Sequence, residues 1–530
     1  MPAANCGRQS SSSTVTAMPG NANHSHGVIL QSTALIGAAS VMNVLLGFAR
    51  TKVLAVLLGP AGVGLWGLYG AFVDLAQSLV GLGVNSSGVR QIAEAVGSGD
   101  GTRIARTARV LRRTSVALGL IAIVSLVVFS RQISVLTFGS ESHAVVVALL
   151  SLAVFLQLVA AAYLALIQGT RRIADLAMAG ISGGVVGTAV TITAVYVFRE
   201  DGLVPALIGI AAAMLLSAWW YGRRTPIAAT PWLTLSDAWR EAVPLLKLGV
   251  AFLSSALITM GVAYAVRIAV LHVEGFEAAG LYQAAWTLGG LYVGFILQAM
   301  GTDFYPRLTA AGRDDARCNH LVNEQARVSV VLAGPGIVGT VSFAPVMLSL
   351  LYSSSFAPAT ELLRWISLGM MLRILSWPMG YIILARAEQG LFIGTEAAWA
   401  IVHVALAWIC LSSFGLNGAG MAFFGSYVFH VLLIFAVVRK RYHFRWSPET
   451  LRSALVHLAL TGVVFVSALG LPPGFAVALG LLALAAGTMY SLRVLVGLVA
   501  LDRWPSALRP FLRARGPSAD GRPTVSREGR

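Results

Sequence analysis

Charged side chains are scarce in this sequence of 530 residues, of which only 11% are Asp, Glu, Lys or Arg. A soluble domain normally carries about 25% charged residues. A chain this poor in charge cannot cover a globular surface with groups that water solvates. Apolar residues make up 57% of the chain, and its mean hydropathy is +0.77. The sequence therefore predicts a membrane protein with almost no soluble domain.

Cysteines and catalytic motifs are also lacking. Cys6, Cys318 and Cys410 have no paired spacing, which argues against a disulfide framework and against a cysteine-based zinc site. The sequence has no phosphate-binding loop ending in Gly-Lys-Ser/Thr, no His-Glu-x-x-His and no Gly-x-Ser-x-Gly motif. We therefore expect a protein that is not an enzyme and holds no metal or cofactor. A coupling ion, H⁺ or Na⁺, stays open.

Apolar runs fill most of the chain between residues 28 and 500. A membrane span needs roughly 20 mostly apolar residues, and about fourteen runs qualify. Two of them are short, so twelve or thirteen spans stay open. The runs lie near residues 29–49, 63–84, 115–130, 144–167, 177–198, 203–221, 245–271, 280–301, 328–351, 360–384, 391–411, 417–438, 453–470 and 475–498. The predicted fold is an all-α polytopic membrane protein.

Basic residues concentrate in alternate gaps between these runs. The net charge is +16, from 38 Lys and Arg against 22 Asp and Glu. Cytoplasmic loops of membrane proteins are rich in Lys and Arg, whereas the gaps on the other face are nearly bare of cations here. We therefore expect both termini in the cytoplasm and no nucleic-acid partner. The basic stretch 91–113 is expected to lie along the anionic cytoplasmic leaflet.

Several landmarks recur at offsets of 213 to 217 residues. Gly64-Leu-Trp opens the second span and Gly280-Leu-Tyr opens the eighth, and Gly202-Leu and Gly415-Leu open the sixth and twelfth. The offset covers six spans, so the two copies enter the membrane in the same direction, as in transporters that bind substrate between two halves. The predicted domains are a disordered cytoplasmic tail at 1–27, six-helix lobes at 28–222 and 244–440, a cytoplasmic linker at 223–243, two further helices within 441–500 and a basic cytoplasmic tail at 501–530.

A few cations lie inside the predicted spans, where a charge usually faces a cavity or a partner. Arg50 and Lys52 come late in the first span, and Arg267 recurs at nearly the same depth in the second copy. Arg373 lies near the middle of the tenth span. Guanidinium groups suit phosphate because they donate two parallel hydrogen bonds. These four residues are the predicted anion-binding cations, and snorkelling to the interface is the alternative for Arg50 and Lys52.

Acidic residues within the spans are fewer. Asp74 and Glu396 either bind a coupling ion or form structural ion pairs. Arg90 and Arg307 end the second and eighth spans, and Asp303 lies one turn before Arg307. These three residues are candidates for a cytoplasmic gate, although anchoring at the cytoplasmic face explains them nearly as well.

The order of several motifs resembles one family. The run from Lys52 to Leu65, which contains Leu-Leu-Gly-Pro-Ala-Gly-Val-Gly, is similar to the end of helix 1 in O-antigen and polysaccharide flippases. Residues 279–283 (Ala-Gly-Leu-Tyr-Gln), 304–308 (Phe-Tyr-Pro-Arg-Leu) and 415–420 (Gly-Leu-Asn-Gly-Ala-Gly) resemble the same group. This group is the polysaccharide-transport branch of the multidrug/oligosaccharidyl-lipid/polysaccharide exporter superfamily. The resemblance covers about residues 28 to 440, and the last two spans depart from shorter members that end after helix 12.

The resemblance implies two six-helix lobes around a central cationic cavity in a bacterial inner-membrane protein. It implies translocation of undecaprenyl-diphosphate-linked glycans, such as O-antigen or exopolysaccharide repeat units, from the cytoplasmic to the outer leaflet by alternating access. The four cations then become candidates to hold the diphosphate or acidic sugars. Membrane lipids, a polysaccharide polymerase and its chain-length machinery are the partners that this role implies, and we expect a monomer.

Two other functions stay open on the sequence alone. A drug/cation antiporter of the same superfamily would favour buried carboxylates over cations in its cavity. A membrane-embedded glycan polymerase or ligase would need a large outer loop with catalytic residues, and none is visible.

Overall fold

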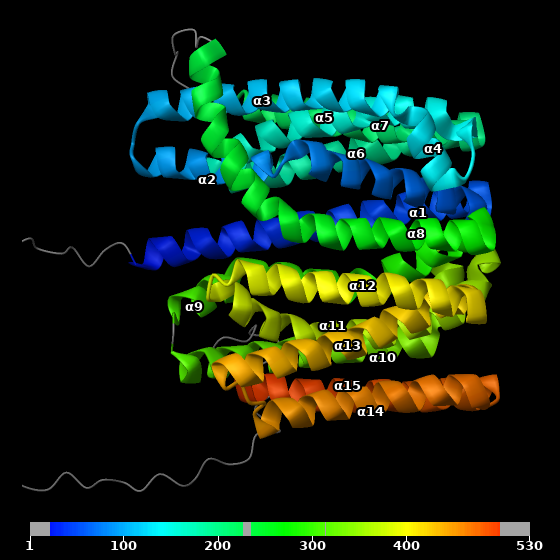
Figure 1. The fold of residues 1–530 in the computed structure, drawn as a ribbon. Helices are drawn as coiled ribbons and strands as arrows, with labels where there is room; N and C mark the ends of the chain where they lie inside the picture. The colour runs from blue at the N-terminus through cyan, green and yellow to red at the C-terminus, as the bar shows by residue number, and fades with distance from the viewer. Residues whose placement is uncertain (1–21, 226–234, 313, 499–530) are drawn as a thin grey trace, which may run out of the picture.

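The computed structural model describes residues 22–225, 235–312 and 314–498, and this part of the chain consists of helices joined by short turns, with no strand. Figure 1 shows long helices that run side by side, with the start of α1 and the end of α15 at the same end of the bundle. The α-helices are α1 (Ala22–Gly81), α2 (Val84–Gly97), α3 (Gly101–Val128), α4 (Ser130–Phe138), α5 (Ala144–Gly169), α6 (Ile173–Phe198), α7 (Leu203–Gly222), α8 (Leu235–Ala299), α9 (Tyr305–Ala310), α10 (Asp315–Leu351), α11 (Thr360–Ala385), α12 (Gln389–Phe414), α13 (Leu416–Tyr442), α14 (Pro448–Gly470) and α15 (Pro473–Leu498).

Eleven stretches of the described chain are long and apolar enough to cross a membrane. Three of them contain a reversal: at Gly59 within α1, at the 3₁₀ turn Arg199–Gly202 between α6 and α7, and at Gly275 within α8. Counting each arm separately gives about fourteen spans. The prediction of an all-α polytopic membrane protein is therefore confirmed.

The two helices that follow the second span differ from the prediction. The carboxylate of Asp100 accepts hydrogen bonds from the backbone N–H groups of Thr102 (2.9 Å) and Arg103 (3.1 Å), which caps α3 at its first turn. From that cap, α3 runs unbroken through the basic residues into the apolar span. Figure 1 shows α2 and α3 parallel to the other helices. The expectation that residues 91–113 lie along the membrane surface is therefore wrong.

Two predicted domain limits fall on helices. Helix α1 begins at Ala22, inside the stretch predicted to be a disordered tail, and α8 begins at Leu235, inside the predicted linker. The rest of the N-terminal tail, residues 226–234 of the linker and the C-terminal tail 501–530 lie outside the described residues.

The backbone repeats with a constant offset of 216 residues. Left-handed φ angles recur in pairs: Gly59 (66°) with Gly275 (88°), Arg171 (56°) with Ala387 (58°), and Arg199 (54°) with Gly415 (59°). The predicted pairing of Gly202 with Gly415 is wrong by one turn. Gly202 instead matches Gly418, because each packs against the carbonyl of the residue eight positions earlier. The reversals are thus built alike in both halves.

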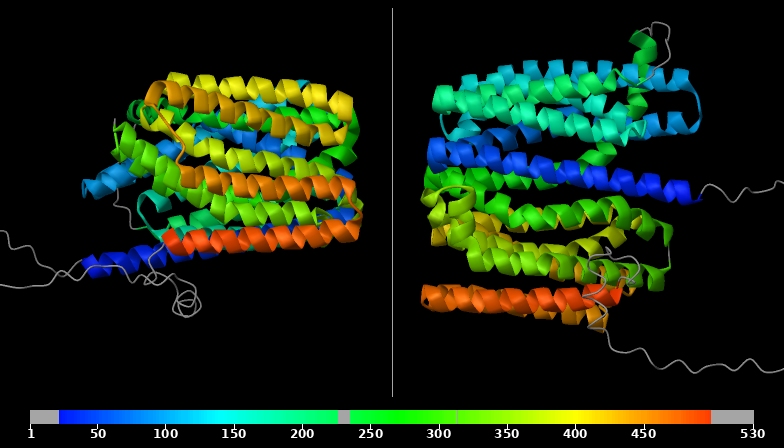
Figure 2. Two further views of the ribbon diagram at one scale, coloured as in Figure 1. Left: turned by 90° about the horizontal axis from the view of Figure 1, so that it is seen from below. Right: turned by 180° about the vertical axis from the view of Figure 1, so that it is seen from behind.

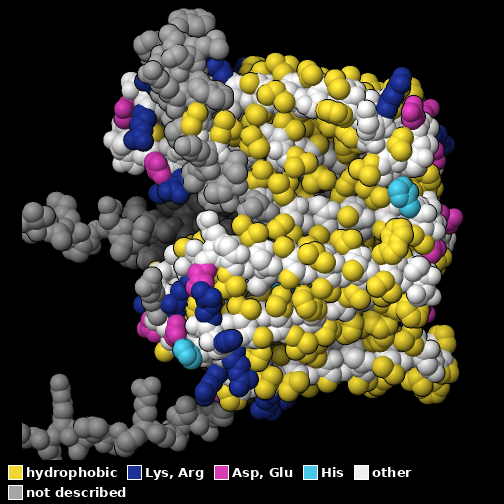
Figure 3. All heavy atoms as spheres, in the orientation of Figure 1, with side chains coloured by type: hydrophobic (Ala, Val, Ile, Leu, Met, Phe, Trp, Pro, Cys, Tyr) yellow, Lys and Arg dark blue, Asp and Glu magenta, His cyan; other side chains and the backbone are white. Residues whose placement is uncertain are grey.

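The two halves meet along α1 and α8, which pack extensively against each other. Helices α2–α7 lie on one side of this pair and α9–α13 on the other, while α14 and α15 pack outside them on α10 (Figures 1 and 2). Figure 3 shows a broad apolar surface between two polar ends, with most of the visible Lys and Arg at the end where α9 lies. This distribution agrees with the charge asymmetry in the sequence.

Candidate functional site

An interior cavity of about 310 Å³ lies between α1 and α8, and both halves of the molecule line it. Trp66 and Asp74 come from the second arm of α1. Arg267 comes from the first arm of α8, and Gln283 and Trp286 from its second arm. The break at Gly275 folds α8 back on itself, which brings residues of both its arms to the cavity wall. The cavity therefore lies where relative movement of the halves would change its shape.

Arg267 is held in a fixed orientation on this wall. Its Nε donates a hydrogen bond to Gln283 Oε1 (3.1 Å), and its Nη1 donates to the carbonyl oxygen of Ala263 (2.8 Å). Its guanidinium carbon lies 6.0 Å from the ring centre of Tyr282 and 5.8 Å from that of Trp286. These contacts use only part of the donor set of an arginine, which has five N–H groups. Arg267 can therefore present further N–H groups to an anion in the cavity.

The Gln283 side chain is itself held in place by contacts with Thr287 and with Gly67 of α1. Its Nε2 donates to Thr287 Oγ1 (3.2 Å), which fixes the amide so that Oε1 faces Arg267. Gly67 of α1 lies directly against this side chain, because a Cβ at Gly67 would lie 2.7 Å from Gln283 Oε1. Close packing of α1 on α8 thus supports the orientation of Arg267.

Arg50, one of the two predicted cations of the first span, repeats this arrangement in part. The guanidinium carbon of Arg50 lies 5.5 Å from the ring centre of Trp66. Trp66 and Tyr282, the ring beside Arg267, are 216 residues apart, so a cation–aromatic pair recurs in both halves. Trp66 lines the cavity, whereas Arg50 contacts this ring and is not itself part of the lining.

The remaining two predicted cations lie away from the described lining of this cavity. Lys52 Nζ donates a hydrogen bond to the carbonyl oxygen of Ser349 (3.2 Å) at the end of α10, so it joins the two halves. The guanidinium of Arg373 lies over Trp377 (4.8 Å) and Tyr427 (5.8 Å), between α11 and α13 of the second half. The structure therefore brings Arg267 and the Arg50–Trp66 pair together and leaves Lys52 and Arg373 apart.

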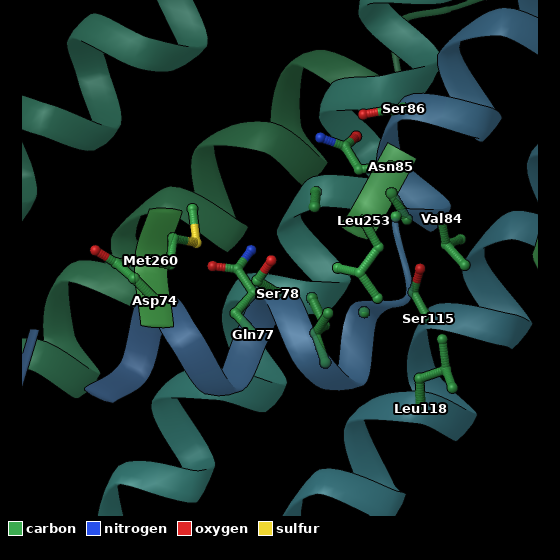
Figure 4. A pocket seen from close by; sticks show the side chains of 15 residues that line it. Asp74, Gln77, Ser78, Val84, Asn85, Ser86, Ser115, Leu118, Leu253 and Met260 are labelled. Carbon is green, nitrogen blue, oxygen red and sulfur yellow. The ribbon is translucent and has the colours of Figure 1, made fainter. Parts of the chain in front are cut away.

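Asp74 lies at the junction of this cavity with a second cavity of about 490 Å³. The Asp74 side chain is exposed to this interior space and makes no hydrogen bond with a described side chain or carbonyl. Figure 4 shows Asp74 and Met260 next to each other at one end of the larger cavity. Asp74 is thus an accessible carboxylate between two compartments.

Glu396 belongs to a buried polar cluster in the second half. Its Oε1 lies 3.5 Å from His430 Nε2, and both side chains are largely buried. The ring nitrogens of His403 and the indole nitrogen of Trp399 are buried nearby, without a hydrogen-bond partner among the described atoms. Both alternatives for Glu396, a coupling ion and a structural ion pair, stay predictions.

The three gate candidates pair within their own halves. Arg90 Nε lies 2.9 Å from Glu94 Oε1, one turn along α2. Arg307 lies 3.3 Å from Asp303 and 3.7 Å from Glu324. Among the described residues, no ion pair joins Arg90 to Asp303 across the two halves, so the three candidates do not close this end in this conformation.

The halves are in contact near the opposite end, where α1 and α8 reverse. A Cβ at Gly64 would lie 2.5 Å from the carbonyl oxygen of Phe276, and Gly280 packs directly on the carbonyl of Pro60. Close by, the hydroxyl groups of Thr137 and Tyr264 are hydrogen-bonded (2.8 Å). The larger cavity reaches the start of α2, at the other end of the second arm of α1. The site is therefore closed at the reversal end.

Sequence reasoning missed the aromatic and amide residues of the site. Trp66, Tyr282 and Gln283 stand in the very motifs that reveal the repeat, yet an aromatic or amide residue in a span usually signals only packing. Their recurrence beside the two in-span arginines was the available signal.

A polytopic helical bundle made of two similar halves, with an interior cavity between them that carries charged groups from each, defines the class of membrane transporters that alternate between two openings. Residues 53–361, more than half of the chain, match the family model described as "Polysaccharide biosynthesis protein", and the chain belongs to this family.

Relatives and solved structures agree with this assignment. The chain is 24% identical over 430 residues to a protein of Escherichia coli strain K12 named lipid III flippase, which covers 76% of this chain and 97% of the relative. The lipid II flippase MurJ in an inward closed conformation superposes with a TM-score of 0.63 at 15% identity, over 87% of this chain and all of that one. An inward-facing multidrug resistance MATE family transporter of the MOP superfamily gives a TM-score of 0.61 at 16% identity, over 76% of this chain and 94% of that one. These likenesses show the fold.

Proposed function

We propose that this protein is a flippase that moves an undecaprenyl-diphosphate-linked oligosaccharide, an O-antigen or exopolysaccharide repeat unit, from the cytoplasmic to the outer leaflet of the inner membrane. The observation that carries the proposal is Arg267, held by Gln283 between two aromatic rings on a wall shared by both halves. The name of the E. coli relative, a lipid III flippase, supports a lipid-linked substrate.

A diphosphate suits this wall for electrostatic reasons. Hydrogen bonds between a guanidinium and a phosphate are charge-assisted and therefore about twice as strong as neutral ones. The aromatic faces around Arg267 exclude water, which strengthens the attraction. Arg50 adds a second positive charge behind Trp66. Lys52 and Arg373 stay candidates for contacts in another conformation, in which the halves are rearranged.

Transport then requires the halves to exchange one opening for the other. In the conformation described here, the contacts of Gly64 and Gly280 close the reversal end, which we assign to the outer face. Separating these contacts while Arg90, Asp303 and Arg307 approach across the cytoplasmic end would expose the same cavity to the outer leaflet. The lipid chains would remain in the bilayer while only the polar head group crosses.

Asp74 is the candidate for coupling to H⁺ or Na⁺. When ionised, its carboxylate attracts a cation and repels a diphosphate in the same cavity. Binding of the coupling cation at Asp74 would therefore change the affinity for the substrate, and the substrate would change the affinity for the cation. Glu396 with His430 is a second candidate, because a buried carboxylate–imidazole pair can exchange a proton. Both termini are assigned to the cytoplasm. Polymerase and chain-length proteins are expected partners of a monomeric carrier.

A drug/cation antiporter is the second candidate, and the accessible carboxylate of Asp74 is the observation that favours it. Such a protein would take a cationic drug at Asp74, whereas Arg267 would repel it. The two functions therefore predict opposite charges for the preferred substrate.

Reconstitution separates the two candidates. Proteoliposomes are loaded with a fluorescent polyprenyl-diphosphate disaccharide, and its exposure at the opposite leaflet is followed by quenching. We expect protein-dependent flipping that Arg267→Ala abolishes and that Arg364→Ala, a control arginine bonded to the carbonyl of Val341 outside the described lining of both cavities, does not. Uptake of a cationic dye without flipping of the lipid would instead establish the antiporter.

A further inference from the structure

The larger cavity has a chemistry that differs from that of the cavity at Arg267. Asp74 is the single ionisable group among its described lining residues. The other polar side chains in the lining are uncharged: Gln77, Ser78, Asn85, Ser86 and Ser115. Apolar side chains lie between them: Leu118, Leu158, Leu253 and Met260. Figure 4 shows Gln77 and Ser78 together in the middle of the lining, with Asn85 and Ser86 beyond them and Ser115 near Leu118.

These polar groups are not used by the fold. None of the five uncharged polar side chains makes a hydrogen bond with a described side chain or carbonyl: Ser115 is buried, Gln77 and Ser78 are half-buried, and Asn85 and Ser86 are exposed. The neighbouring Ser87 shows the usual behaviour of a helix serine, since its hydroxyl donates to the carbonyl of Val84 (3.1 Å). Buried polar side chains normally have a hydrogen-bond partner. The five groups around this cavity are therefore all available to a ligand that carries matching donors and acceptors.

A backbone break at one end of this compartment has no counterpart in the second half. Between α1 and α2, Leu82 (φ 47°) and Gly83 (φ 64°) adopt left-handed conformations that break the helix. The break leaves Asn85 and Ser86 on the cavity wall beyond Gln77 and Ser78. At the corresponding place in the second half, α8 continues through a π-helical turn, Met300–Phe304, without such a break. The break is thus a specific feature of the first half, and symmetry between the halves does not require it.

We infer that this compartment is a subsite for the first, uncharged sugars of the lipid-linked glycan, and this inference rests on the proposed function. Sugar hydroxyl groups both donate and accept hydrogen bonds, and an amide side chain offers a donor and an acceptor side by side, as Gln77 and Asn85 do. The apolar side chains suit the C–H faces of a sugar ring. A volume of about 490 Å³ lies within the range of ligand pockets.

The position of the compartment fits the order of groups in such a lipid. It shares Asp74 and Met260 with the cavity at Arg267, so a diphosphate bound at Arg267 places the adjoining sugars beside Asp74. The Asp74 carboxylate disfavours a second negative charge there, because like charges repel strongly in a low dielectric. The subsite therefore selects N-acetylated or neutral hexoses and rejects uronic acids in the sugar positions nearest to the diphosphate.

The test compares three probes in proteoliposomes: a polyprenyl diphosphate without sugar, the same lipid with a neutral N-acetylated disaccharide, and one with a uronate as its first sugar. Gln77→Ala and Asn85→Ala remove one subsite amide each. Asn417→Ala is the matched control, since its amide binds Glu361 (3.0 Å) outside the described lining of both cavities. Binding of each probe to the detergent-solubilised full chain is measured in parallel.

Loss of one hydrogen bond, about 1 kcal/mol, corresponds to a fall of roughly fivefold in affinity for the neutral disaccharide lipid. The sugar-free lipid should change less than twofold, and Asp74→Asn should raise binding of the uronate lipid relative to the neutral one. An equal loss for all three probes, or no loss for any, overturns the subsite. If the wild-type protein flips none of the probes, the proposed function fails. If the wild-type protein binds the sugar-bearing and the sugar-free lipids with equal affinity, the subsite is overturned, whatever the outcome of the flipping assay.

Discussion

Asp74 and Arg267 face one interior cavity from opposite halves of the molecule, and no ion pair of 4 Å or less joins them. The space between them is open to a ligand that carries both a negative group and hydrogen-bonding groups. If these charges neutralised each other directly, neither would be available to substrate or coupling ion. Their separation is thus the feature that a transport cycle can use.

Asp74→Asn removes the ionisable group and keeps the shape and hydrogen-bonding capacity of the side chain. We expect the variant to lose the dependence of flipping on an imposed pH or Na⁺ gradient, because amides do not titrate. Its rate without a gradient should stay within a few-fold of the wild type. Flipping assays at two gradients measure this directly. If the Asp74→Asn protein still responds to the gradient, Asp74 is not the coupling residue, and Glu396 with His430 becomes the candidate.

Arg267→Ala should lower the affinity for a lipid diphosphate by roughly tenfold or more, because a hydrogen bond to a charged group is worth about 1.5–3 kcal/mol. Arg267→Lys keeps the charge but loses the planar donor set, so it should recover only part of the affinity. Membrane levels of both variants should equal those of the wild type. Binding of the sugar-free lipid diphosphate is the cleanest readout, and unchanged binding by Arg267→Ala would remove Arg267 from the site.

Gln283→Ala tests whether Gln283 acts through Arg267. The single variant should weaken binding of the lipid diphosphate by about 1 kcal/mol, since the arginine keeps its bond to Ala263 but loses its second anchor. The double variant Arg267→Ala with Gln283→Ala should bind no more weakly than Arg267→Ala alone. Additive losses in this double-mutant cycle would mean that Gln283 contacts the substrate itself.

The sequence predicted the membrane class, the span count and the repeat because hydropathy and charge act through local composition. It predicted that Arg267 faces a cavity, because a cation inside an apolar run usually faces a cavity or a partner, and Arg267 does line one. It could not separate Arg50 from Lys52, two residues apart, since their different surroundings depend on how α1 packs: Arg50 meets Trp66, and Lys52 meets Ser349 of α10.

The sequence could not predict the polar compartment at Asn85, for a related reason. Serine and asparagine at the end of a span look like ordinary loop residues. Their place on a cavity wall follows from two left-handed residues, and one of them, Leu82, gives no hint of such a conformation in its side chain. The mistaken surface helix at 91–113 has a similar cause, because amphipathic composition does not fix the direction in which a helix leaves the membrane.

Gly280→Ala tests the closure of the reversal end. The new methyl group would meet the carbonyl of Pro60, which is backbone and cannot turn away. Overpacking typically costs about 1–3 kcal/mol, so the equilibrium should shift away from the closed reversal end by roughly fivefold to a hundredfold. Gly261→Ala, which adds a methyl group to open space in the same helix, is the control.

Distances between spin labels at position 141 and position 412, two exposed sites at that end in opposite halves, report this shift in a background without the three cysteines. The Gly280→Ala protein should show a longer distance, and the Gly261→Ala protein the wild-type distance. Identical distributions in all three would show that the two glycines do not hold the halves together.

Gly334→Ala addresses the hairpin α14–α15, which lies outside the two repeated halves. Gly334 of α10 packs directly on the ring of His457, whose nitrogens bond to the carbonyl of Ser453 and the hydroxyl of Ser491 (3.0 Å each). A methyl group there would push the ring out of these bonds and separate α14 from α10. We expect a lower melting temperature for the detergent-solubilised protein, by several degrees, and no change for Gly462→Ala, which faces open space on α14.

Adding His457→Ala to Gly334→Ala should restore part of the stability, because removing the ring removes the clash. A further loss of stability instead would show that the hairpin depends on the His457 hydrogen bonds more than on close packing at Gly334.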